Sequence, residues 1–166
     1  MKRKMATDEN GEEYDDNGER AIFFARGVLE TVKKLRWSPD VIHCQGWMGY
    51  IVPLFIKAAY NSEPAFADTK VVTSVFADGL KKNIGDNFKN CLEFKDVTVD
   101  SLSAYKDDFD FMELGKLAID NSDAVVEAEE GANPELIAYA KSKGIPVLAY
   151  PGEDYTVAYK KFYEEL

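Results

Sequence analysis

The sequence has few of the residues from which many catalytic and metal sites are built. Among 166 residues there is one histidine, His43, and there are two cysteines, Cys44 and Cys91. No CxxC pair and no cysteine–histidine cluster is present, so neither a zinc site nor a redox dithiol is expected. Two isolated thiols are typical of a protein in a reducing compartment. We therefore expect a cytoplasmic protein that carries no metal and no cofactor.

Several sequence motifs are also absent. The chain contains no G-x-S-x-G, no G-x-G-x-x-G and no G-x-x-x-x-G-K-[ST]. This excludes the common serine nucleophile motif and the simplest nucleotide-binding loops. The most apolar stretch, residues 47–60, contains Pro53 and Lys57 and is too short to span a bilayer. A polar, acidic stretch follows residues 1–4, so no signal peptide is expected.

Positive charge is scarce. There are 20 lysines and arginines against 30 aspartates and glutamates, which gives a formal net charge of −10. Such a surface repels phosphate backbones and anionic lipid headgroups. We therefore expect neither nucleic acid nor a membrane as a partner.

The chain has the length of a single domain, and helical and strand patterns alternate along it. Apolar residues spaced by three and four predict a helix up to about residue 36, begun by an Asp16–Glu19 capping box. Further helices are expected over residues 47–60, 111–121, 134–142 and 154–166, and strands over residues 40–44, 70–76, 124–126 and 145–150. Residues 77–109 are expected to form a long connection with short helices. The alternation indicates an α/β protein, a three-layer Rossmann-like parallel sheet of about four strands.

The carboxyl ends of the predicted strands are the expected place for a ligand, as in other open α/β sheets. His43, Gln45 and Trp47 lie at the first of these ends. An amide can bond sugar hydroxyls while an indole covers the sugar ring. Two other interpretations stay open, namely that His43 is a structural hydrogen-bonding residue and that Trp47 is part of the core.

Three successive motifs resemble those of bacterial glycogen synthases and plant starch synthases. They are Asp16-Asn17-x-x-Arg20, then Trp37-Ser38-Pro39-Asp40-Val41-Ile42-His43-Cys44-x-x-Trp47, then Val52-Pro53-Leu54. The family has D-N-x-x-R, W-x-P-D-V-[IV]-H-x-H-D-W and V-P-x-[YF] in the same order. A weaker likeness continues through Thr73, and through Lys116 followed by Ser122-Asp123-Ala124-Val125.

The resemblance implies a GT-B fold and transfer of glucose from ADP-glucose to an α-1,4-glucan. Residues 1–166 would then form the later half of the first, acceptor-side domain, without the domain that mostly binds the sugar nucleotide. Residues 1–15 would be flexible or would cover a sheet edge. The substrate-binding residues would be Asp16, Asn17, His43, Gln45 and Trp47, with His43 the only catalytic candidate.

The sequence also departs from the family at its cleft. Gln45 replaces the second histidine of H-x-H-D-W, Gly46 replaces its aspartate, and Val75 and Phe76 replace a histidine–asparagine pair. An amide cannot act as the cationic donor that an imidazole provides. We therefore expect a glycogen synthase-like domain that does not transfer glucose on its own. The alternative is a non-catalytic scaffold that binds α-glucan or forms oligomers.

Two features distinguish these interpretations. An exposed Trp47 beside Gln45 would favour sugar binding, whereas a Trp47 buried against the first helix would favour a scaffold role. The first predicted strand would have an exposed edge, which is a site for pairing with another chain. We expect this edge to be covered by residues 1–15 or by a second copy in a homo-oligomer.

Overall fold

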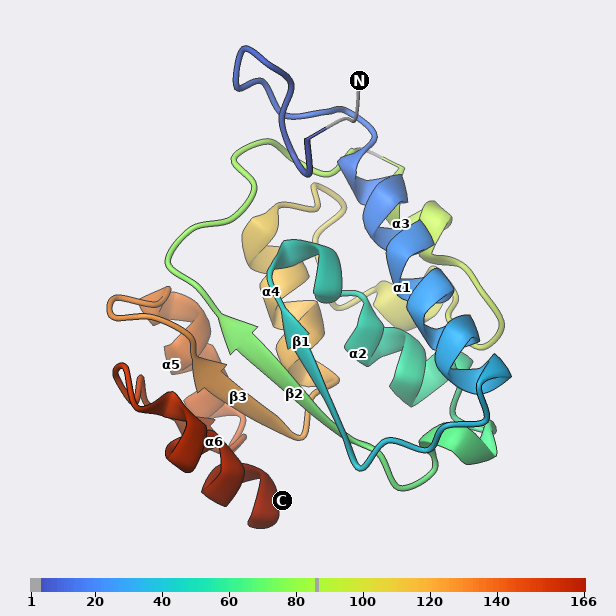
Figure 1. The fold of residues 1–166 in the computed structure, drawn as a ribbon. Helices are drawn as coiled ribbons and strands as arrows, with labels where there is room; N and C mark the ends of the chain where they lie inside the picture. Colours follow the sequence, from blue (N-terminus) through green and yellow to red (C-terminus); the bar gives the residue numbers. More distant parts are fainter. Residues whose placement is uncertain (1–3, 86) are drawn as a thin grey trace.

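A computed structural model describes residues 4–85 and 87–166, and its centre is one parallel sheet. The strands are β1 (Val41–Gln45), β2 (Lys70–Val75), β3 (Ala124–Glu127) and β4 (Val147–Leu148). They lie in the order β1-β2-β3-β4, and each neighbouring pair is parallel (Figure 1). The expected α/β class with a four-stranded parallel sheet is confirmed.

The connections between the strands are largely helical. The α-helices are α1 (Asn17–Lys34), α2 (Val52–Leu54), α3 (Phe88–Leu92), α4 (Phe111–Asp120), α5 (Pro134–Ser142) and α6 (Tyr155–Glu164). Short 3-10 turns form η1 (Trp47–Gly49), η3 (Pro64–Phe66) and η4 (Asp100–Leu102), and η2 (Phe55–Ala59) is a π-helical turn. In the described part of the long connection between β2 and α4, the helical elements are the short α3 and η4, as expected for residues 77–109.

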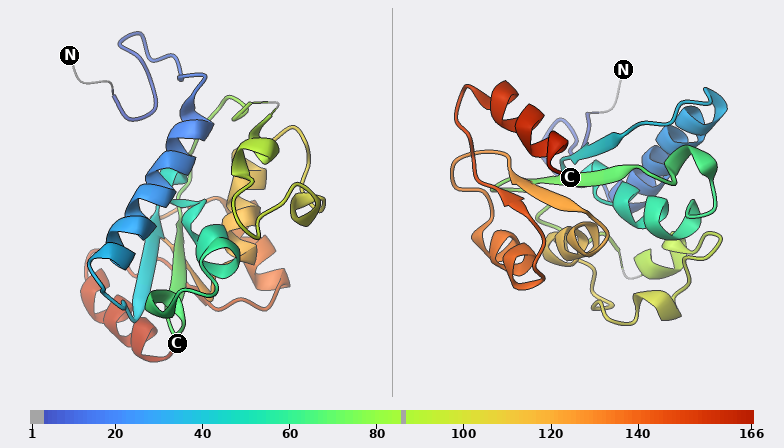
Figure 2. Two further views of the ribbon diagram at one scale, coloured as in Figure 1. Left: turned by 90° about the vertical axis from the view of Figure 1, so that its right-hand side faces the viewer. Right: turned by 90° about the horizontal axis from the view of Figure 1, so that it is seen from below.

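The two faces of the sheet are covered unequally. On one face α2, α4 and α5 pack against β-strand residues such as Val71, Val75 and Val125 in the main core. On the other face α6 lies over a small cluster formed by Val72, Ala124 and Val126 (Figure 2). Helices therefore lie on both faces, which gives the expected three layers.

Helix α1 begins where the sequence predicts it, but without the capping hydrogen bond that the sequence predicts there. Asp16 occupies the N-cap position without a side-chain capping hydrogen bond, so the predicted capping box is wrong. The helix ends at Lys34, and Arg36 takes a left-handed backbone with φ +52°. Helix α1 packs against the helical turns that follow β1 through Ala25 and Leu29, both fully buried.

Two other predicted elements are shorter than expected. The helix predicted over residues 47–60 is broken into η1, α2 and η2, with Pro53 inside α2. The last strand contains only Val147 and Leu148; it begins after Pro146, which has no N–H to donate but whose carbonyl accepts from the Val125 N–H at 2.9 Å.

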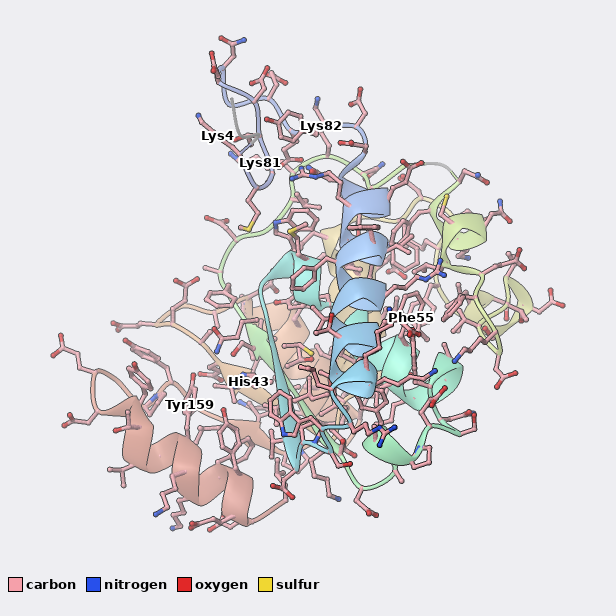
Figure 3. The ribbon with its side chains drawn as sticks, turned by 45° about the vertical axis from the view of Figure 1, so that its right-hand side comes forward. Lys4, His43, Phe55, Lys81, Lys82 and Tyr159 are labelled. Atoms are coloured by element: carbon pink, nitrogen blue, oxygen red, sulfur yellow. The ribbon has the colours of Figure 1, made fainter. Side chains whose placement is uncertain are left out.

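The N-terminal segment, residues 4–15, is held in place by α1 and by the loop after β2. The Glu13 carboxylate accepts hydrogen bonds from the backbone N–H groups of Lys81 (2.8 Å) and Lys82 (2.8 Å). Figure 3 shows Lys4, Lys81 and Lys82 gathered where these two stretches meet. These bonds attach the segment beside the carboxyl ends of the strands; a role in covering the β1 edge stays a prediction.

No helix in residues 4–85 and 87–166 has the length and apolar character that crossing a membrane requires.

Candidate functional site

A cleft of about 510 Å³ opens beyond the carboxyl ends of the strands, where the topology predicts a ligand site. Its volume falls within the range of small-molecule sites. The residues that line it come from the ends of β1, β2, β3 and β4 and from α6. They are Gln45, Ser74, Phe76, Ala128, Tyr150, Gly152, Glu153, Tyr155 and Tyr159.

The chemistry of this strand-end cleft is aromatic and nearly uncharged. Tyr150, Tyr155 and Tyr159 supply ring faces and hydroxyl groups, and Tyr155 is 53% exposed. Gln45 supplies an amide and Glu153 supplies a carboxylate. None of the described lining residues is a lysine or an arginine. Such a surface suits a neutral, hydroxyl-rich ligand better than a phosphate.

Hydrogen bonds between neighbouring loops fix the rim of the cleft. The Ala128 N–H donates to the Val75 carbonyl at 2.9 Å, and the Ala77 N–H donates to the Glu129 carboxylate at 2.6 Å. At the end of β4, Gly152 has φ +76°, in the left-handed region that favours glycine. The cleft is therefore shaped by the backbone as well as by its side chains.

His43 lies behind the cleft rather than in it. Its Nδ1 is 2.6 Å from the Tyr163 hydroxyl and its Nε2 is 2.7 Å from the Ser74 hydroxyl. The ring is half-buried, and this burial lowers the pKa of His43 to about 4. At neutral pH the imidazole is therefore uncharged, and both of its nitrogens have protein partners.

Gln45 and Trp47 are separated by the turn at Gly46, which has φ +71°. Gln45 is exposed and lines the cleft. Trp47 is only 8% exposed and belongs to the main core, although it also borders a second groove beside the N-terminal segment. Burial of Trp47 is the arrangement that favours a scaffold role for this side chain.

Asp16 and Asn17 lie at the start of α1, outside the residues that line the cleft. Asn17 is 3% exposed; its amide donates to the Ala6 carbonyl and accepts from Arg20, both at 2.9 Å. Asp16 borders a shallow groove together with Arg20. The structure therefore brings Gln45 into the cleft, His43 behind it, and the other predicted residues elsewhere; their part in substrate binding stays a prediction.

Sequence reasoning missed the tyrosines of α6. Tyr155 and Tyr159 line the cleft, and Tyr163 bonds His43. They are spaced by four residues, which places them on one face of a helix. That spacing is visible in the sequence, but nothing in it indicates that α6 folds back to the end of the sheet.

Comparison with known proteins gives one family. The family model described as the starch synthase catalytic domain matches residues 2–145. Its boundary divides the cleft, because Gln45, Ser74, Phe76 and Ala128 lie inside the match whereas the lining residues from Tyr150 onward lie outside it.

Curated relatives match over a shorter stretch. The glycogen synthase of Chlorobium limicola is 46% identical over 66 residues, which cover 40% of this chain and 14% of that protein. The glycogen synthase of Clostridium perfringens is 45% identical over 60 residues, covering 36% of this chain and 12% of that protein. The glycogen synthase of Vibrio parahaemolyticus is 43% identical over 67 residues, which cover 40% of this chain and 14% of that protein. The matched part is thus a small fraction of each relative's length.

Proposed function

Because the chain belongs to the starch synthase catalytic domain family, we propose that it is an acceptor-side domain that binds α-glucan in the strand-end cleft. The proposed domain extends over residues 1–166 and corresponds to the later half of the family's first domain. In this proposal the domain binds glucan chains and does not transfer glucose on its own.

The observation that carries the proposal is the composition of the cleft. Glucose rings have apolar faces edged by hydroxyl groups, so tyrosine rings can cover the faces while an amide and a carboxylate bond the hydroxyls. Tyr150, Tyr155, Gln45 and Glu153 offer these groups on one concave surface. A sugar nucleotide would bring phosphate charges beside Glu153 with no described cation in the lining, which favours the neutral polymer.

The second candidate function is an oligomerisation scaffold, favoured by apolar side chains outside the core. Phe23 is 81% exposed, and Leu35 and Trp37 are also largely exposed at or beyond α1. The half-buried β1 lies at the edge of the sheet. Exposed apolar groups and an edge strand are each typical of an interaction surface.

Calorimetric titration of the chain with maltooligosaccharides and, separately, with ADP-glucose tests the proposal. We expect the maltooligosaccharide to bind and ADP-glucose to give neither binding nor turnover. Tyr155→Ala should weaken maltooligosaccharide binding at least five-fold because it removes a ring from the cleft. Phe23→Ala removes an exposed ring on α1 and is the matched control, which should bind as the wild type does.

Three results would count against the proposal. Absence of maltooligosaccharide binding contradicts glucan recognition and leaves the scaffold candidate. Glucose transfer from ADP-glucose by the chain contradicts the non-catalytic part. Wild-type binding by the Tyr155 variant, or a loss that the Phe23 variant shares, would contradict binding in the cleft.

A further inference from the structure

The ring of His43 joins the sheet to the C-terminal helix. His43 lies on β1, and its two nitrogens contact the Tyr163 hydroxyl of α6 and the Ser74 hydroxyl of β2. The ring of Tyr159 is a further neighbour, at a centroid distance of 5.7 Å. Figure 3 shows His43 and Tyr159 near each other, between β1 and α6. One side chain therefore connects two strands with one helix.

Helix α6 packs on the sheet through an apolar interface that is separate from the main core. None of the residues of α6 is fully buried. The cluster beneath it has three buried members, Val72, Ala124 and Val126, and the side chains that α6 and the chain end pack on them are only partly buried: Tyr159, Phe162, Tyr163 and Leu166. Because this interface is only partly buried, directional bonds also contribute to the docking of α6.

The position of α6 also shapes the cleft. Tyr155 and Tyr159 lie one turn apart on α6 and line the cleft. Ser74, which bonds His43, lines the cleft from the side of the sheet. The bonds that hold α6 thus share residues with the surface that a ligand would touch.

We propose that His43 is a positioning residue that docks α6 onto the sheet and thereby places the tyrosine wall of the cleft. The ligand-binding part of this inference rests on the glucan binding proposed above, whereas the docking part does not. His43 touches no ligand in this arrangement. It acts on the ligand through Tyr159, Tyr163 and Ser74.

The neutral imidazole is the form that suits this role. One of its ring nitrogens donates a hydrogen bond and the other accepts one. It can therefore bond one hydroxyl that acts as acceptor and one that acts as donor. The titratable groups that contact the ring are Tyr159 and Tyr163 of α6, and β2 contributes the uncharged Ser74. Desolvation by burial is the cause of the lowered pKa of His43. Protonation would place a charge in this half-buried contact and favour release of α6.

Hydrogen exchange and calorimetry on the same variants of the full chain test the inference. His43→Leu removes both bonds, Tyr163→Phe removes one from the α6 side, and His43→Gln keeps a donor and an acceptor. We expect amide exchange across residues 155–164 to rise at least ten-fold in the Leu and Phe variants and less in the Gln variant. Exchange in α4 should stay at the wild-type rate, which controls for global unfolding. Maltooligosaccharide affinity should fall at least five-fold in step with the loss of protection.

Wild-type protection of α6 in both His43→Leu and Tyr163→Phe overturns the inference. So does a loosened α6 with unchanged maltooligosaccharide affinity, because the tyrosine wall would then not depend on docking. If the Leu variant does not fold, Tyr163→Phe, which alters a hydroxyl near the surface, decides the same question. If the wild type binds no maltooligosaccharide, the proposed function fails, and exchange in residues 155–164 still supports or overturns the docking role by itself.

Discussion

The family resemblance assigns Asn17 to substrate binding, whereas the structure gives its side chain a structural role. Replacing Asn17 by alanine distinguishes these two roles. The Asn17 side chain is buried, its amide nitrogen donates to the Ala6 carbonyl, and its oxygen accepts from Arg20. Arg20 in turn donates to the Lys4 carbonyl at 3.2 Å. Asn17 is therefore the centre of the contacts that attach the N-terminal segment to α1.

The expected loss of stability follows from these two bonds. A typical hydrogen bond contributes about 0.5–1.5 kcal/mol, so losing two costs about 2 kcal/mol. For a chain of this size, a loss of that amount lowers the melting temperature by about 4–8 °C. Release of residues 4–15 should also make this segment susceptible to protease, since its anchoring bond at Ala6 is lost.

Thermal unfolding followed by circular dichroism measures the first effect, and limited proteolysis with mass spectrometry measures the second. Asn61→Ala, at an exposed asparagine, is the matched control and should melt at the wild-type temperature. The reasoning is refuted if Asn17→Ala melts as the wild type does and yet binds maltooligosaccharide ten-fold more weakly. Asn17 would then contact the ligand, as the resemblance implies.

Three further outcomes are expected. Burial lowers the pKa of His43 from 6.5 to about 4, so the unfolded chain takes up this proton first as the pH falls. The stabilising effect of the neutral ring is therefore present above pH 6.5 and is lost between pH 6.5 and 4. Urea unfolding at pH 7 and pH 5 should show a larger loss of stability for the wild type than for His43→Gln. Gly115→Ala should destabilise by about 1–2 kcal/mol in urea unfolding, because the added Cβ would lie 2.6 Å from the buried Leu136 side chain and the helix propensity of alanine offsets only part of that clash. Cys44 is buried and its pKa is raised to about 12, whereas Cys91 is partly exposed. A thiol reagent should therefore modify Cys91 alone in the native chain and both cysteines in urea. Rapid labelling of Cys44 in the native chain would contradict the packing of β1.

Much of the fold could be predicted from periodicity and turn chemistry. The apolar spacing in α1 and the Asn133 cap of α5 are local features, and the structure has both helices near their predicted bounds. The parallel order of the strands follows from their alternation with helices. The broken helix after β1 could not be predicted, because the π-turn Phe55–Ala59 packs in the core through tertiary contacts that no short sequence window contains.

The sequence predicts where the cleft lies but not which residues line it. Strand ends indicate where a ligand binds, and Gln45 lies there. His43 lies two residues before Gln45 and therefore on the same face of β1, but further from the strand end, where its ring contacts Tyr163 of α6 instead of the cleft. Trp47 follows a left-handed glycine turn that takes it into the core. Tyr155 and Tyr159 reach the cleft only through the return of α6, which is a long-range event.

The division of the cleft at the family boundary has a consequence for how its specificity can change. Residues 149–166 carry Tyr150, Glu153 and the α6 tyrosines, and they contribute nothing to the buried part of the main core. If the cleft binds glucan as proposed, substitutions there should alter ligand preference without disturbing the main core, whereas Ser74 lies within β2 and Ala128 donates its N–H to the Val75 carbonyl of that strand. Under the proposed function, the C-terminal stretch could therefore vary between relatives and change which glucan binds, provided that α6 keeps the side chains that pack on Val72, Ala124 and Val126.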